Sequence, residues 1–261
     1  MPDVAVVLWH IEVSHYNEKA RWALDYKAVP HELRVPMPGF HGLTALRLTR
    51  GKHRRLPLIE IDGRRIGDST AIIAALEEYA PDPPLYPPGD ADRRRALALE
   101  DWFDENLGPE LRRYVWHHTL PDTDVVARTL FQEEGTRREQ MLRRTAPVAS
   151  FFVRRDYTVN AKTAARARDR VVAAMDKLEA ELGDSGYLVG DRFSVADLTA
   201  AALFTPLVAP PERPYAPTAR VPAVQDLRDE LMARPGGEWI ERMYALHRGS
   251  PQAQEAHVVG G

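Results

Sequence analysis

The stretch RRLPLIEIDGRRIGDSTAII, residues 54–73, carries the signals that decide the fold of the first third of the chain. An apolar run from Leu58 to Ile61 is followed by Asp62-Gly63, a dipeptide that favours the tight turn of a β-hairpin. The run from Arg64 to Ile66 then predicts the second strand of that hairpin. Asp68-Ser69 comes next, and both residue types are common at the start of a helix. The stretch therefore predicts a hairpin that leads directly into a capped helix.

The residues before this stretch predict a strand, a helix and a second strand. Val4 to Trp9 is a short β-branched run, typical of a buried strand. Ser14 caps a helical pattern that ends at Val29-Pro30, and His31 to Val35 is expected to form the second strand. Pro36 to Gly51 is expected to be an irregular connector or a broken helix. The order strand, helix, strand, hairpin, helix predicts a small α/β unit over residues 1–80.

A proline-dense segment, APDPPLYPPG, marks a change in the chain. Proline cannot continue a helix and stiffens the backbone, so residues 81–90 are predicted to be a linker between domains. Residues 91–248 then show helical patterns without a strand pattern, and residues 249–261 are expected to be a flexible tail. The expected helices are Ala91–His118, Asp122–Arg144, Lys162–Leu182, Ser194–Val208, Val221–Arg234 and Gly237–His247.

Composition excludes several classes of function. The 261 residues contain 44% hydrophobic and 28% charged residues, with a net charge of -3, which is typical of a globular protein and gives no general case for nucleic-acid binding. Cysteine is absent, so disulfides, thiolate metal sites and a cysteine nucleophile are excluded. No His-Glu-x-x-His pattern or carboxylate cluster with ligand spacing occurs, so we expect no metal.

The sequence also favours a particular location. The first residues, MPDVAVVLWHIEVSH, lack a basic start followed by a long apolar stretch, so we expect no signal peptide. No apolar run approaches the length of a membrane span, so we expect no membrane partner. A cytoplasmic location is therefore expected.

Three motifs resemble those of the cytosolic glutathione transferase superfamily: RLPLIEIDG...GDSTAI, SHYNEKAR from Ser14 to Arg21, and GDRFSVADL from Gly190 to Leu198. The resemblance covers nearly the whole chain. It implies an N-terminal thioredoxin-like domain followed by an all-helical domain. The start of the first helix is most similar to the serine-type theta and zeta classes, because no cysteine stands at the key position.

The resemblance also implies a glutathione site. Proline is the residue that tolerates a cis peptide, and the family has a cis proline where Pro57 stands, which would let Leu56 pair with the cysteinyl backbone of glutathione. Pro57 could alternatively be a proline at a strand start. Helix N-termini attract carboxylates, and by resemblance Ser69 would bind the γ-glutamyl carboxylate and Asp68 the amino group; the alternative is plain N-capping. Arg55 stands where some members have a glutathione-binding lysine.

Several neighbours have weaker assignments. Lys52, His53 and Arg54 are expected to form a solvated basic loop, and His41 is a weaker candidate for the glycine carboxylate. In the long predicted helix, aromatic residues are expected in the core or a dimer interface, but Tyr114 is also a candidate for the pocket of the second substrate.

Ser14 is the candidate for chemistry. A thiol is mostly protonated at neutral pH, and a hydroxyl donor together with a helix N-terminus stabilises the thiolate. Ser14 could instead be only an N-cap. The family often has proline after the catalytic residue, whereas this chain has His15, and Tyr16 and Asn17 are alternative donors. His10 and His15 are further candidates, for a histidine-assisted mechanism, but a lone histidine near a helix start is more often expected at the surface.

The motif FSVADL is a capping box in which Ser194 and Asp197 satisfy each other's backbone donors, so Asp197 is expected to stabilise the fold. For function, the sequence predicts an enzyme that activates a glutathione thiol for attack on a hydrophobic electrophile, by conjugation, isomerisation or dehalogenation. The alternatives are a non-catalytic binding module of the same fold and an enzyme that uses another thiol, such as mycothiol. The resemblance further implies a homodimer.

Overall fold

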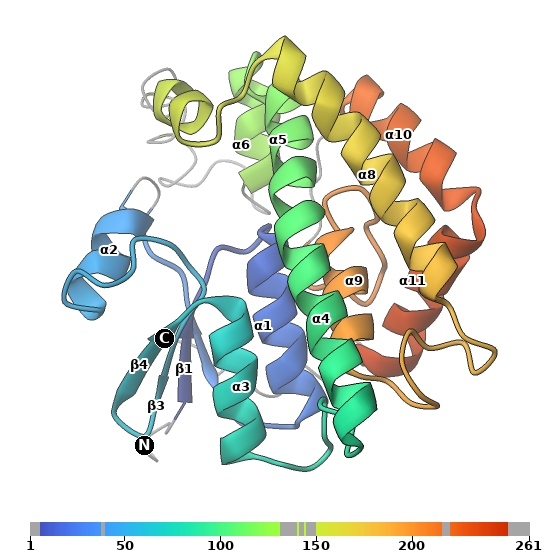
Figure 1. The fold of residues 1–261 in the computed structure, drawn as a ribbon. Helices are drawn as coiled ribbons and strands as arrows, with labels where there is room; N and C mark the ends of the chain where they lie inside the picture. Colours follow the sequence, from blue (N-terminus) through green and yellow to red (C-terminus); the bar gives the residue numbers. More distant parts are fainter. Residues whose placement is uncertain are drawn as a thin grey trace.

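The computed structural model describes residues 6–37, 40–130, 140, 144, 150–215 and 220–249, and Figure 1 shows the fold. A small sheet with three helices forms the N-terminal part. Helices form the rest of the described chain. None of the helices in these ranges is long and apolar enough to cross a membrane.

The sheet has the order β2-β1-β3-β4. Its strands are β1 (Val6–Trp9), β2 (Glu32–Arg34), β3 (Leu58–Ile61) and β4 (Arg64–Gly67). β1 runs parallel to β2 and antiparallel to β3, and β3 runs antiparallel to β4. The helices of this part are α1 (His15–Tyr26), α2 (His41–Leu48) and α3 (Ser69–Tyr79). This mixed sheet with helices is the thioredoxin-like domain that the resemblance implied.

The hairpin forms where the sequence predicted it. Asp62 and Gly63 have φ values of 48° and 72°, so both lie in the left-handed region that a two-residue primed turn requires. Strand β4 then ends at Gly67, and Asp68 caps α3 directly. The strand pairs and the helix start on each side of the turn are therefore set by neighbouring residues.

Alternation along the strands gives the sheet two apolar faces. Val6, Leu8 and Ile59 belong to the main core, which also contains buried residues of α1 and α3. Leu58 on the opposite face packs with Ala45 of α2. Pro36 to Gly51, expected to be an irregular connector or a broken helix, thus contains one short helix whose apolar side covers the second face of the sheet.

The second part of the chain is helical, as predicted, and in the described ranges no strand follows β4. Its helices are α4 (Asp90–Asn106), α5 (Gly108–Thr119), α6 (Thr123–Leu130), α8 (Ala161–Glu181), α9 (Val195–Leu203), α10 (Pro222–Met232) and α11 (Pro235–His247), with a further helical segment at 150–156. Figure 1 shows α4 and α5 running one after the other alongside α1. The main core continues from α1 into this part through Trp22, which packs on Phe193 and Tyr244.

Three predicted helices differ from the observed ones. The helix expected over Ala91–His118 breaks at Leu107, because Pro109 has no N–H and its ring clashes with the preceding turn. The helix expected over Ser194–Val208 ends at Leu203, because Pro206 disfavours helical backbone at the residue before it. The helix expected over Asp122–Arg144 is observed only as α6, and most of its remainder, like residues 250–261 of the expected tail, lies outside the described residues.

Asp197 forms the core of a buried cap at the start of α9. Its Oδ2 accepts hydrogen bonds from the Ser194 N–H (2.9 Å) and hydroxyl (2.8 Å), and its Oδ1 accepts one from the Leu188 N–H (2.8 Å). Burial raises the pKa of this carboxyl to about 6. The cap therefore joins α9 to the preceding loop, which agrees with the predicted structural role.

Candidate functional site

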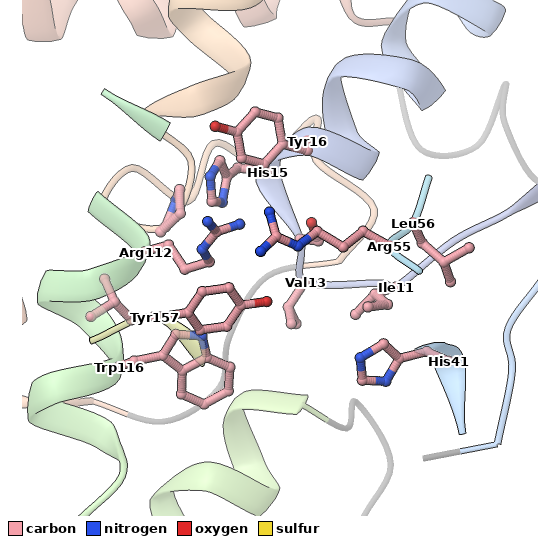
Figure 2. Close-up of a pocket in the computed structure, with 13 residues that line it drawn as sticks. Ile11, Val13, His15, Tyr16, His41, Arg55, Leu56, Arg112, Trp116 and Tyr157 are labelled. Carbon is pink, nitrogen blue, oxygen red and sulfur yellow. The ribbon is translucent and has the colours of Figure 1, made fainter. Parts of the chain in front are cut away.

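Two adjoining cavities lie where α1, the loop before β3 and α3 face α4 and α5. The apolar cavity has a volume of about 150 Å³ and a mostly apolar lining. The polar groove has a volume of about 670 Å³. They share Tyr16, Arg55, Leu56 and Arg112, so they form one divided site. The apolar cavity is lined by Ile11, Val13, Ser14, His15, Tyr16, His41, Arg55, Leu56, Arg112, Val115, Trp116, Tyr157 and Pro206 (Figure 2).

Ser14 lies at the N-cap position of α1 and borders the apolar cavity. Its hydroxyl oxygen accepts a hydrogen bond from the Asn17 side-chain N–H (2.7 Å). The oxygen of the Asn17 amide accepts one from the Ile11 N–H (3.1 Å), so the orientation of this buried amide is fixed from both ends. Ser14 makes no side-chain cap bond to the helix. No described residue accepts the hydroxyl proton of Ser14, so this proton is available for donation to a group in the cavity.

Tyr16 and Asn17, the alternative donors, are already engaged. The Tyr16 hydroxyl donates to the Asp104 carbonyl of α4 (2.7 Å). Burial raises the pKa of the Tyr16 phenol far above its ordinary value, and Asp104 raises it further. Asn17 orients Ser14. Of the three candidate donors, Ser14 has the hydroxyl whose proton is uncommitted among the described residues.

His15 and His10 are buried, so the expectation that a histidine here lies at the surface is wrong. His15 is 4% exposed, and its Nε2 lies 3.1 Å from the Gly108 carbonyl oxygen. Burial, together with the charges of Arg112 and Arg213, lowers the pKa of His15 to about 3. The ring is therefore uncharged, and Nε2 donates its proton to Gly108. His10 is fully buried against Arg21 (2.7 Å).

The loop before β3 contributes the shared wall of the two cavities. The Leu56–Pro57 peptide bond is cis, as the resemblance implied. Leu56 borders both cavities, and its N–H and C=O make no hydrogen bond with another described residue. Lys52, His53 and Arg54 are exposed, as expected, and they line the polar groove together with Arg55.

Asp68 and Ser69 lie at the other end of the polar groove. Asp68 Oδ1 accepts hydrogen bonds from the N–H groups of Thr70 (3.0 Å) and Ala71 (3.2 Å), which is a regular helix cap. Its Oδ2 has no partner among the described side chains and backbone groups. Ser69 is 2% exposed and borders the groove. The capping alternative and a ligand role are therefore geometrically compatible, because each uses a different oxygen.

Tyr114 lies away from both cavities. It is 5% exposed, and its hydroxyl donates to the Ala223 carbonyl of α10 (2.8 Å). The prediction that it lines a substrate pocket has no support in this placement. The side of α5 that borders the apolar cavity carries Arg112, Val115 and Trp116 instead. His41, the weaker candidate, does border the apolar cavity.

Sequence reasoning missed Arg112, Tyr157 and the buried state of His15. Arg112 and Trp116 are four residues apart, a spacing that places both on one side of a helix and could have pointed to them together. Tyr157 follows the helical segment 150–156 and reaches the site only because that segment folds back, and no local pattern shows this. His15 is buried because Gly108, ninety-three positions away, lies against it.

Comparisons with known proteins agree with this architecture. The family model described as the glutathione S-transferase N-terminal domain matches residues 8–84, and that of the C-terminal domain matches residues 143–235. A maleylacetoacetate isomerase from Dictyostelium discoideum is 29% identical over 112 residues, which are 42% of this chain and 51% of that protein. The match therefore spans about half the length of this curated relative.

Solved structures of similar fold cover almost the whole chain. Human glutathione S-transferase T1-1 in its apo form has a TM-score of 0.63 and 18% identity, over 97% of this chain and 87% of its own. The β-etherase LigF from a Sphingobium strain has a TM-score of 0.60 and 21% identity, over 91% and 99%. A Methylobacterium radiotolerans glutathione S-transferase in complex with glutathione sulfonate has a TM-score of 0.51 and 24% identity, over 95% and 96%. At these identities the likeness concerns the fold.

Proposed function

Since the chain belongs to the cytosolic glutathione S-transferase superfamily, we propose that it binds glutathione in the polar groove and that Ser14 activates its thiol for transfer to an electrophile. The observation that carries this proposal is the orientation of Ser14. Asn17 donates to the serine oxygen, and Ser14 borders the cavity, so the hydroxyl would direct its own proton to a group bound there. A hydroxyl donor at a helix N-terminus stabilises a thiolate and lowers the pKa of the thiol.

The polar groove fits the remaining parts of glutathione. The γ-glutamyl carboxylate would bind Ser69 at the start of α3, where helix N–H groups favour an anion. The uncommitted Oδ2 of Asp68 would accept a hydrogen bond from the amino group. The free backbone groups of Leu56 would pair with the cysteinyl residue, and the exposed Arg55 would lie near the glycine end. This order places the sulfur toward Ser14.

The apolar cavity would hold the second substrate. Ile11, Val13, Val115, Trp116 and Pro206 give it apolar walls. In a conjugation, the thiolate sulfur forms a bond to the electrophilic carbon, and a leaving group departs with the electron pair of the bond that breaks. The thiol proton leaves to solvent.

Isomerisation is a second candidate, favoured by the match to a maleylacetoacetate isomerase. The thiolate would add to one carbon of a double bond, the resulting single bond would rotate, and elimination would return the thiolate. Glutathione is consumed in conjugation and regenerated in isomerisation. A count of free thiol during turnover of a cis-configured unsaturated substrate separates the two reactions.

The proposal is tested by calorimetric titration of the protein with glutathione. We expect Ser69→Ala to weaken binding because it removes a carboxylate ligand. Ser14→Ala is expected to leave binding largely intact and to abolish the ultraviolet absorbance of the bound thiolate. Ser185→Ala, on an exposed loop, is the matched control and should change neither reading. Wild-type protein that binds no glutathione at millimolar concentration would contradict the proposal and point to another thiol, such as mycothiol, or to a non-catalytic module.

The family resemblance also leads us to propose a cytoplasmic homodimer. Light scattering of the purified protein should then give twice the mass of the chain. A species of single-chain mass at all accessible concentrations would contradict the dimer.

A further inference from the structure

Arg112 of α5 is a cation that forms no ion pair with any described residue. It lies half-buried in the wall between the two cavities, and its Nε is fully buried without a hydrogen-bond partner. In the described part of the chain, Arg112 makes no ion pair and no hydrogen bond. Burial lowers the pKa of its guanidinium, and Arg55 and Arg113 lower it further, while Tyr157 and Tyr16 act in the opposite direction. A buried charge of this kind costs free energy unless a ligand neutralises it.

Two aromatic rings hold the guanidinium by its faces. Its central carbon lies 4.2 Å from the centre of the Tyr157 ring and 5.7 Å from that of Tyr16. Stacking of this kind uses the faces of the guanidinium plane and leaves its N–H edge available. The aromatic contacts therefore orient Arg112 without satisfying its donors.

A second unpaired cation faces the first. Arg55 also makes no ion pair or hydrogen bond with a described residue, and its guanidinium carbon lies 5.9 Å from the centre of the same Tyr157 ring. Figure 2 shows the guanidinium groups of Arg112 and Arg55 turned toward each other across the apolar cavity. Among the described residues that line this cavity, none is an aspartate or a glutamate. Asp101 and Asp104 border the polar groove, which both arginines also line, but neither carboxylate forms an ion pair with Arg112 or Arg55.

The two histidines that line the apolar cavity add no charge to it near pH 7. Burial lowers the pKa of both His15 and His41. The charge of Arg112 lowers that of His15 further, and the charge of Arg54 lowers that of His41 further. Both rings are therefore neutral near pH 7. The cavity combines apolar walls with two cations whose donors point inward.

We propose that the second substrate is an apolar electrophile that carries a carboxylate, and that this carboxylate binds the N–H edge of Arg112 on the side that faces Arg55. A planar carboxylate matches the paired N–H donors of a guanidinium edge. This inference rests on the proposed function, because the bound acid is a substrate only if the protein activates a thiol that attacks it. It assigns Arg112 as the residue that selects acidic over neutral electrophiles.

The test compares an acid with its neutral isostere. Naphthoate and naphthamide are unreactive probes of the same shape, and calorimetry measures the binding of each with and without glutathione. We expect wild-type protein to bind naphthoate at least about tenfold more tightly than naphthamide, because hydrogen bonds to a charged group are the stronger ones. Arg112→Gln should abolish the preference, and Arg112→Lys should retain part of it.

Arg94→Gln is the matched control, since it removes an arginine charge from an exposed position on α4 and should leave the preference unchanged. Equal binding of the two probes by wild-type protein would overturn the inference, as would a preference that survives in Arg112→Gln. Loss of glutathione binding in Arg112→Gln would also overturn it, by assigning Arg112 to a glutathione carboxylate. A protein that prefers naphthoate through Arg112 but binds no glutathione would contradict the proposed function while supporting the carboxylate site.

Discussion

Lys19 and Arg112 are two cations that the fold shields from water, and they differ in whether carboxylates surround them. Lys19 of α1 is fully buried, and its Nζ lies 2.8 Å from a Glu100 carboxylate oxygen and 3.0 Å from both Asp104 oxygens. Burial alone would lower the pKa of Lys19, but Asp104 and Glu100 outweigh it and raise the value. Arg112 is less buried and pairs with no carboxylate in the described part of the chain.

This difference distinguishes a charge that stabilises the fold from a charge that is available to a ligand. Lys19 joins α1 to α3 and α4, because its Nζ also donates to the Thr70 hydroxyl (3.0 Å), so its charge is used within the fold. The guanidinium of Arg112 borders a cavity, where its charge is available to a bound ligand. A protein that keeps an uncompensated charge sacrifices stability at that position, as binding sites commonly do.

The largest expected effect is that of Lys19→Met. The substitution leaves the buried Glu100 and the partly buried Asp104 without their cation, so we expect the free energy of unfolding to fall by about 3–5 kcal/mol. Chemical denaturation measures this change. Lys162→Met, at an exposed position of α8, should stay within about 0.5 kcal/mol of wild type. Equal stability of the two variants would remove the distinction between Lys19 and Arg112.

Glu18 extends the comparison to an anion. Burial would raise its pKa, but Arg248 (2.8 Å) and Arg21 (2.8 Å) outweigh burial and lower it from 4.5 to about 2. Its folded value lies below the unfolded one, so its stabilising contribution is complete above pH 4.5 and is lost as the pH falls toward 2. Because one pKa unit corresponds to about 1.4 kcal/mol, this loss is about 3 kcal/mol.

Denaturation measured between pH 2 and pH 5 tests the effect of Glu18. We expect Glu18→Gln to lower stability at neutral pH and to flatten the decline on acidification. Glu78→Gln, at an exposed position of α3, should keep the wild-type slope. An unchanged slope in Glu18→Gln would show that this carboxylate does not contribute to acid sensitivity.

Asp197→Ala should have a smaller effect. It removes the acceptor of three hydrogen bonds at the start of α9, and loss of such a cap costs about 1 kcal/mol or more. Thermal unfolding measures the difference. Asp191→Ala, in the exposed loop nearby, is the control and should leave the melting temperature unchanged. An unaltered melting temperature in Asp197→Ala would contradict the capping assignment.

Arg112→Leu should have the smallest effect on stability and the opposite sign. Removal of an unpaired, partly buried charge is expected to raise the free energy of unfolding by up to about 1 kcal/mol. The same denaturation assay used for Lys19→Met gives the value. Destabilisation as large as that of Lys19→Met would show that Arg112 serves the fold and would weaken its assignment as a ligand group.

Much of the thioredoxin-like domain could be predicted because its signals are local. The Asp62-Gly63 turn and the Asp68 cap depend on residues within a few positions of each other. The helical part was predicted as a class, but Pro109 and Pro206 ended helices that the apolar pattern alone would have continued. Residues 54–69 indicated the polar groove for the same reason, since they are consecutive in the chain.

The sequence by itself determined the hairpin, the helix starts, the change from a sheet to helices, and Ser14 and Ser69 as candidate residues, because short-range turn and capping chemistry specifies these features. Only the tertiary structure decided which candidate donors are free. Asp104 engages Tyr16 from eighty-eight positions away, and Gly108 buries His15. It also decided that no carboxylate of the described residues pairs with Arg112, because the balance of charge in a cavity depends on which distant segments meet there.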